Sequence, residues 1–137
     1  MQLFSTGLAA ASGSAVKSKV VLVAGGAGFL GSALCERMLN DGHDVICLDN
    51  LISGDMANIA PFLAHPGFRF IQQDVIHAPR IAGPVHEIYN MACPASPPRY
   101  QRDPIHTMRT CFEGAKNLLD LAVQKGARIL LSSTSEV

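Results

Sequence analysis

Three glycines with a regular spacing lie between an apolar run and a segment with helical periodicity. Gly25, Gly28 and Gly31 occur in the stretch VLVAGGAGFLGSAL. The first glycine would permit a tight turn, the second would let the backbone approach a pyrophosphate, and the third would let the helix pack closely on the strand. The N–H groups at the start of that helix, at Phe29 and Leu30, would then face phosphate oxygens. The alternative is an ordinary tight turn, because a glycine triplet alone is a weak signal.

Two aspartates follow at the ends of later apolar runs. Asp49 comes 18 residues after Gly31, a position from which a carboxylate can accept hydrogen bonds from both hydroxyls of an adenosine ribose. A 2′-phosphate there would be repelled, so the pattern favours NAD over NADP, although Asp49 could also be a turn residue. Asp74 could border the adenine or simply cap a loop.

The elements that must position these residues alternate between strand and helix patterns. A continuous β-branched run beginning at Lys19 predicts a parallel strand covered on both faces. We expect helices over 29–40 and 104–125, a short helix within 54–67, and further strands over 44–50, 68–75, 85–92 and 127–134. The alternation predicts an α/β fold, a Rossmann-type doubly wound parallel sheet with five strands present and the chain truncated before the sixth. Residues 1–18 are expected to be a flexible tail and 19–137 an incomplete NAD-binding domain.

The long helix is expected to begin with Pro104 in its first turn and to end before Gly126. It carries an apolar stripe that we expect to pack on the sheet, formed by Ile105, Met108, Phe112, Ala115, Leu119 and Ala122. Four more residues widen the apolar surface beyond one stripe: Cys111, Leu118, Leu121 and Val123. A second packing partner, such as another subunit, is therefore an open alternative.

Composition excludes several classes of function. Nearly half of the 137 residues are hydrophobic and 16% are charged, as in a globular domain. Eleven basic residues balance eleven acidic ones without runs of like charge, which gives no support to nucleic-acid binding. No apolar stretch approaches the roughly 20 residues that span a bilayer, so we expect a cytoplasmic protein. The five histidines lack metal-ligand spacing, and the four cysteines are expected to be reduced and mostly buried.

Longer motifs carry a resemblance to a known family. The stretches GGAGFLG and CLDNLISG resemble the extended short-chain dehydrogenase/reductases that act on nucleotide sugars. The segments NMACPASPPRYQRDP and LLSSTSEV are more specific and resemble UDP-glucuronate decarboxylases, which form UDP-xylose through a 4-keto intermediate with a recycled NAD. The resemblance implies UDP-glucuronate as the substrate and a homodimer. It assigns Asn50, Val75 and Ala92 to the cofactor, Pro94, Ala95, Ser96 and Ser135 to the substrate, and Thr134 and Glu136 to catalysis at C4 and C5.

The alternatives are a dTDP-glucose 4,6-dehydratase-like or epimerase fragment and a stand-alone NAD-binding module. Dehydratases of the group carry an aspartic acid between the threonine and the glutamate, where this chain has Ser135. The family's asparagine is replaced by Cys111, which cannot supply an amide's donor and acceptor. The family's Tyr-x-x-x-Lys pair is missing too, since Cys93 and Pro104 lie four residues after Tyr89 and Tyr100. We therefore expect the chain alone to be inactive.

Overall fold

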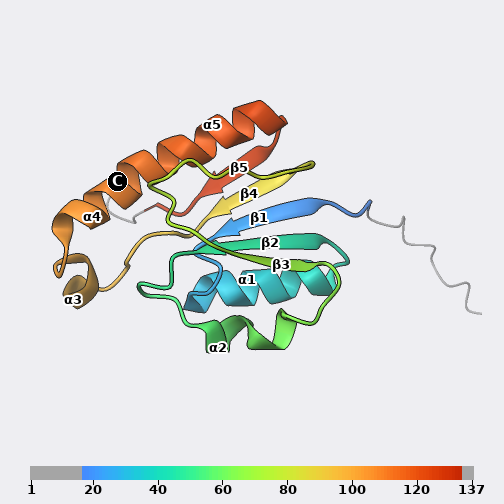
Figure 1. Cartoon of the computed structure of the whole chain (residues 1–137), viewed down its shortest axis with the longest axis horizontal. Coiled ribbons are helices and arrows are strands. Elements are labelled where there is room, and N and C mark those ends of the chain that lie inside the picture. The colour runs from blue at the N-terminus through green and yellow to red at the C-terminus, as the bar shows by residue number, and fades with distance from the viewer. Residues whose placement is uncertain (1–16, 134–137) are drawn as a thin grey trace, which may run out of the picture.

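The computed structural model describes residues 17–133 of the chain. Its five strands form one parallel sheet in the order β3-β2-β1-β4-β5, as predicted for a Rossmann-type doubly wound fold (Figure 1). The strands are β1 (Val20–Ala24), β2 (Asp44–Asp49), β3 (Phe68–Gln72), β4 (Glu87–Asn90) and β5 (Arg128–Leu131). The expected tail lies almost wholly outside the described residues, and so do Thr134, Ser135 and Glu136.

Helices cover both faces of the sheet. On one face lie α1 (Phe29–Asn40), α2 (Met56–Ile59) and the 3₁₀ turn η1 (Ala60–Phe62); on the other runs α5 (Ala115–Lys125) (Figure 1). The helix α5 continues α4 (Pro104–Arg109) through a π-helical turn η2 (Thr110–Gly114), and α3 (Pro97–Tyr100) precedes α4. Side chains of β1 alternate between two cores: Leu22 faces α5, and Val23 faces α1. This explains the unbroken apolar run, because both faces of β1 are buried.

The ends of the long helix agree with the sequence prediction. Pro104 is its first residue, after the N-cap Asp103, whose carboxylate accepts a hydrogen bond from the N–H of His106. Gly126 ends it in the left-handed conformation with φ of 64°.

The predicted packing stripe was wrong for most of its members. Four of its residues are half or more exposed: Ile105, Met108, Phe112 and Leu119. The buried face carries Ala122, which the prediction included, together with Thr110, Gly114, Leu118 and Leu121. Spacings of three and four residues fit both faces, and the π-helical turn shifts the register between α4 and α5. Gly114 lies on the inner face, where a larger residue does not fit: a Cβ there would come 2.6 Å from Cγ2 of Val75.

Two other expectations need correction. The third to fifth strands are shorter than predicted. The third ends at Gln72, because Asp74 forms a turn by accepting a hydrogen bond from the N–H of Ile76. All four cysteines are free, but only Cys35 and Cys47 are buried. The other two are exposed because they lie at the end of the sheet rather than between its layers. Within residues 17–133, no helix has the length and apolar character needed to cross a membrane.

Candidate nucleotide-binding site

The predicted cofactor residues meet at the carboxyl edge of the sheet, where ligands bind in open α/β folds. Turns that follow β1, β2, β3 and β4 contribute to this edge. The turn after β1 is fixed by the N–H of Gly25, which donates to the carbonyl oxygen of Leu48 at 2.8 Å, and by that of Gly28, which donates to the carbonyl oxygen of Gly25 at 3.1 Å.

Two glycines of the triplet leave no room for a side chain, and the third leaves little. Gly25 has φ of 77°, and a Cβ on it would lie 2.7 Å from the carbonyl oxygen of Met91. Gly31 permits the tightest contact, because a Cβ there would overlap the carbonyl group of Gly25. A Cβ on Gly28 would meet only the carbonyl oxygen of Gly25, at 3.2 Å. Sequence reasoning missed Gly26, where a Cβ would come 2.5 Å from Sγ of Cys47.

The start of α1 is available to an anion. Gly28 occupies the N-cap and has no side chain with which to satisfy the first N–H groups, and the first turn carries no acidic residue. Phe29 and Leu30 follow, with 88% and 67% of their surface exposed. Unsatisfied N–H groups and the positive end of the helix together favour a phosphate at this position.

Asp49 lies beside this turn and holds it in place. One carboxylate oxygen accepts the N–H of Ala27 at 3.0 Å, and the other accepts the N–H of Leu51 at 2.8 Å. A carboxylate oxygen can accept more than one hydrogen bond, so both retain capacity for ribose hydroxyls. Gly54 was missed from the sequence: a Cβ there would lie 2.8 Å from the carboxylate of Asp49. Leu51 adopts φ of 62°, which is uncommon for a leucine.

Asn50 and Asp74 form a hydrogen-bonded pair that reaches the long helix. The carboxylate of Asp74 accepts a hydrogen bond from the Asn50 amide at 2.7 Å and contacts Nε2 of His106 at 2.7 Å. Burial alone would raise the pKa of Asp74, but the hydrogen bonds from Ile76 N–H, Asn50 and His106 outweigh it and lower that pKa. Asp74 therefore both caps its loop and joins the site to α4, a role that the sequence did not reveal.

The backbone at Val75 is held from the same helix. Nδ2 of Asn117 donates to the carbonyl oxygens of Val75 and Ile76 at 2.9 and 3.0 Å. Val75 itself is buried against Gly114. An asparagine in the middle of a predicted helix was the only available signal for Asn117.

The segment after β4 forms another wall of the site. The N–H of Ala92 donates to Oδ1 of Asn90 at 3.1 Å, next to the Gly25 turn. Pro94, Ala95 and Ser96 lead from there into α3. A guanidinium N–H of Arg99 donates to the carbonyl oxygen of Ser53 at 3.1 Å, which ties α3 to the turn after β2. The three predicted substrate residues thus border the cofactor residues.

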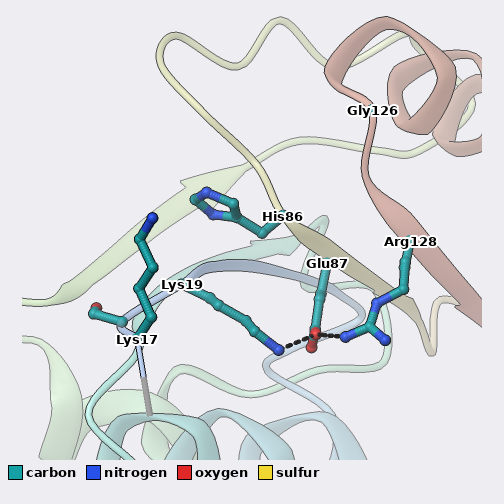
Figure 2. Close-up of a pocket in the computed structure, with 7 residues that line it drawn as sticks. Lys17, Lys19, His86, Glu87, Gly126 and Arg128 are labelled. Carbon is teal, nitrogen blue, oxygen red and sulfur yellow. Dashed lines mark hydrogen bonds and ion pairs between the residues drawn. The ribbon is translucent and has the colours of Figure 1, made fainter. Parts of the chain in front are cut away.

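A cavity of about 310 Å³ lies at the opposite, amino-terminal edge of the sheet (Figure 2). Glu87 is central to its ion pairs: Lys19 lies 2.6 Å away, and Arg128 contacts the same oxygen. The hydrogen bond from Lys19, assisted by those from Arg128 and Tyr89, lowers the pKa of Glu87 to about 2. The charges of Lys19, Glu87 and Arg128 satisfy one another, and the cavity lies at the edge of the sheet opposite the candidate site.

Comparison with known sequences gives the family context. Residues 21–137 match the sequence profile of the NAD dependent epimerase/dehydratase family. UDP-glucuronic acid decarboxylase 1 from Danio rerio is 44% identical over 119 residues, which are 87% of this chain and 28% of that protein. UDP-glucuronic acid decarboxylase 1 from Arabidopsis thaliana is 43% identical over 117 residues, 85% of this chain and 26% of that protein. The chain thus spans about a quarter of the length of these relatives.

Solved structures share the fold. DesIV from Streptomyces venezuelae, a dTDP-glucose 4,6-dehydratase with NAD and TYD bound, is 32% identical with a TM-score of 0.72, over 80% of this chain and 38% of that one. UDP-N-acetylglucosamine 4-epimerase from Methanobrevibacter ruminantium M1 is 27% identical with a TM-score of 0.76, over 88% and 39% of the two chains.

Proposed function

Because the chain belongs to the NAD dependent epimerase/dehydratase family, we propose that it forms the NAD-binding part of a nucleotide-sugar enzyme. The observation that carries the cofactor proposal is the close contact of Gly31 with Gly25, which brings the uncapped start of α1 to the carboxyl edge of the sheet. The relatives named UDP-glucuronic acid decarboxylase favour UDP-glucuronate as the substrate of the complete enzyme.

The described residues fit the cofactor. The N–H groups at the start of α1, at Phe29 and Leu30, would hold the pyrophosphate, and Asp49 would accept the adenosine ribose hydroxyls. Asn50 and Asp74 would border the adenosine half, since both lie on turns adjoining Asp49. Ala92 is close to Gly25 and would limit the cleft from the side of β4.

When bound, NAD⁺ would supply a reversible hydride acceptor for C4 of the sugar. The residues of this chain would position the sugar and handle its protons. Thr134 would orient the C4 hydroxyl, and Glu136 would act near C5, where a neighbouring ketone eases loss of the carboxylate. Both assignments rest on the family resemblance and fall outside the described residues. Pro94, Ala95, Ser96 and Ser135 would contact the sugar nucleotide.

Binding of the cofactor tests the first part of the proposal. Calorimetry with the 137-residue chain should show binding of NAD⁺ in preference to NADP⁺ because Asp49 repels a 2′-phosphate. Equal affinities for the two nucleotides would contradict the assignment of Asp49.

The chain by itself should not form UDP-xylose from UDP-glucuronate when NAD⁺ is supplied. Removal of a general base typically costs about 10²–10⁴-fold in rate, and the Tyr-x-x-x-Lys pair of the family is absent from these 137 residues. The test is an overnight incubation with product analysis by mass spectrometry. Formation of UDP-xylose that is lost in Thr134→Ala would overturn this proposal.

If the source gene encodes a longer product with a Tyr-x-x-x-Lys pair, that product tests the substrate and should release UDP-xylose from UDP-glucuronate. A dehydratase is the second candidate, favoured by the likeness to DesIV. Against it, Ser135 is a poor acid for the departure of a hydroxyl group. Release of a 4-keto-6-deoxy sugar would support the dehydratase instead.

We also propose that the enzyme is a homodimer that buries the outer face of the long helix. The outer apolar stripe consists of Ile105, Met108, Phe112, Leu119 and Val123, each at least half exposed. Ile105 and Met108 belong to α4, Phe112 to η2, and Leu119 and Val123 to α5, so exposed apolar side chains follow the long helix along most of its length. Exposed apolar surface of this extent is typical of an interaction site.

A further inference from the structure

Two cysteines from distant parts of the sequence lie side by side at the carboxyl edge of the sheet. Cys93 follows β4, Cys111 lies in the π-helical turn η2, and their Sγ atoms are 3.2 Å apart. Both residues are exposed. An approach of about 1.2 Å would bring the two sulfur atoms to covalent bonding distance. We propose that Cys93 and Cys111 form a reversible intramolecular disulfide on reaction with a low-molecular-weight disulfide such as oxidised glutathione.

The other two thiols differ in their surroundings. Cys35 and Cys47 are fully buried beneath the glycine turn. The hydrogen bond between them, together with burial, raises the pKa of Cys47. A buried thiol that stays protonated is a poor nucleophile and is closed to a glutathione-sized reagent. Oxidised glutathione should therefore react with Cys93 and Cys111, because only these two thiols are accessible to it.

The reaction balances without a further reagent. The thiolate of one cysteine attacks a sulfur of oxidised glutathione, so that one molecule of glutathione leaves and a mixed disulfide remains. The thiolate of the second cysteine then attacks the Sγ atom of the first cysteine in this mixed disulfide. This step releases a second glutathione and forms the Cys93–Cys111 bond. Overall, the two protein thiols are oxidised and the glutathione disulfide is reduced to two thiols. The Cys93 thiol is partly shielded from water although the residue is exposed, and this shielding and the hydrogen bond with Cys111 raise the pKa of Cys93 to about 11. The reaction therefore accelerates with rising pH.

The bond would join a wall of the nucleotide site to a firmly packed part of the molecule. Cys93 separates Ala92 from Pro94, within the segment that leads to α3. Cys111 lies next to Thr110, which is buried, and close to Gly114, which packs on Val75. The disulfide would therefore restrain the segment from 92 to 96. This inference does not depend on the identity of the cofactor or substrate.

The test treats the 137-residue chain with oxidised glutathione, alkylates the remaining thiols and digests with trypsin without reduction. Cleavage at Arg99, Arg102 and Arg109 places the two cysteines on separate peptides. The parent and Cys35→Ala should yield a linked Cys93–Cys111 peptide, which dithiothreitol removes. Cys93→Ala and Cys111→Ser should yield none. The rate should rise about tenfold per pH unit below the thiol pKa.

A second measurement needs no variant. The reduced parent should bind one phenylarsine oxide per chain, because trivalent arsenic bridges two adjacent thiols. After oxidation, hydrogen exchange should slow at Ala95 and Ser96, which retain amide protons between prolines. A stable glutathione adduct without the linked peptide, a bond between two chains, a bond to Cys35 or Cys47, or unchanged exchange at Ala95 and Ser96 would each overturn the proposal.

Discussion

Nε2 of His106 lies 2.7 Å from a carboxylate oxygen of Asp74, so one contact joins the first helical turn of α4 to the loop after β3. Because the same carboxylate oxygen accepts the amide of Asn50, the helix is coupled to the turn beside Asp49. If the nucleotide binds where we propose, this contact makes His106 a positioning residue for its site.

His106→Ala should weaken NAD⁺ binding severalfold and reduce the free energy of unfolding by about 0.5–1.5 kcal/mol, the contribution of one hydrogen bond. The pKa of Asp74 should rise, because one of the groups that lower it is removed. Calorimetry and NMR titration of the Asp74 carboxyl measure both effects. His77→Ala, at an exposed neighbouring position, is the control. An unchanged pKa of Asp74 in His106→Ala would contradict the coupling.

Asp49→Ala should narrow the preference for NAD⁺ over NADP⁺ and weaken NAD⁺ binding. It should also reduce stability by about 1–3 kcal/mol, since the N–H groups of Ala27 and Leu51 lose their acceptors. Asp55→Ala separates the two effects: it removes the side-chain N-cap of α2, at a cost of about 1 kcal/mol, and leaves the Asp49 carboxylate bonded to the N–H groups of Ala27 and Leu51. The nucleotide preference of Asp55→Ala should equal that of the parent.

Gly31→Ala should reduce stability by more than 2 kcal/mol, roughly the level of a strong core clash, because its Cβ would overlap the carbonyl of Gly25. Gly42→Ala is the control, because it adds the same methyl group at a position with room for it. Gly42 has φ of 82°, and nothing lies within 4 Å of the added Cβ. Its cost should stay near that of the backbone strain, about 1 kcal/mol. Thermal unfolding of both variants measures the difference, and equal losses would contradict the role assigned to Gly31.

The pKa of Glu87 falls from an ordinary value of 4.5 to about 2 in the folded chain. Since the folded pKa is the lower one, the carboxylate stabilises the fold above pH 4.5, and this contribution disappears as the pH falls toward 2. Glu87→Gln should cost roughly 1–3 kcal/mol at pH 7, and this cost should shrink as the pH falls from 4.5 toward 2. Asp120→Asn, which breaks an exposed ion pair with Lys116, should change stability little. Urea unfolding of the parent and both variants from pH 2 to pH 7 measures these differences in the free energy of unfolding. A cost of Glu87→Gln that does not change with pH would contradict the prediction.

Phe112→Glu should convert a self-associating chain to a monomer, because it places a charge in the outer apolar stripe. Sedimentation at several concentrations measures the change, and Lys116→Ala on the same helix is the control. The edge strand β5 offers a competing surface, since Leu130 and Leu131 are about half exposed. If Leu131→Lys makes the chain monomeric and Phe112→Glu does not, the interface is formed by β5 and not by the long helix. A stable monomer of the parent at high concentration would contradict both proposed interfaces, the outer apolar stripe and the edge of β5.

The sheet order and the glycine turn could be predicted from the sequence because they depend on local patterns: apolar runs, a glycine spacing, and strict handedness of the connections. The contacts between His106 and Asp74, and between Asn117 and Val75, could not, since they join segments whose separation in sequence carries no periodic signal. The packing face of the long helix was mistaken because Gly114, rather than a large apolar residue, makes its closest approach to Val75.

The parallel sheet also determines the order in which the chain can fold. The central strand β1 has no neighbour close in sequence: Val21 pairs with Val45 on one side and with Glu87 on the other. During synthesis, β1 must therefore wait for residues of β4 to leave the ribosome before its second edge is covered. Pairings between such distant segments slow folding, because a long loop closes before the contacts form. The apolar side chains of β1 that face α5, such as Leu22, stay uncovered still longer, because α5 follows β4 in the chain.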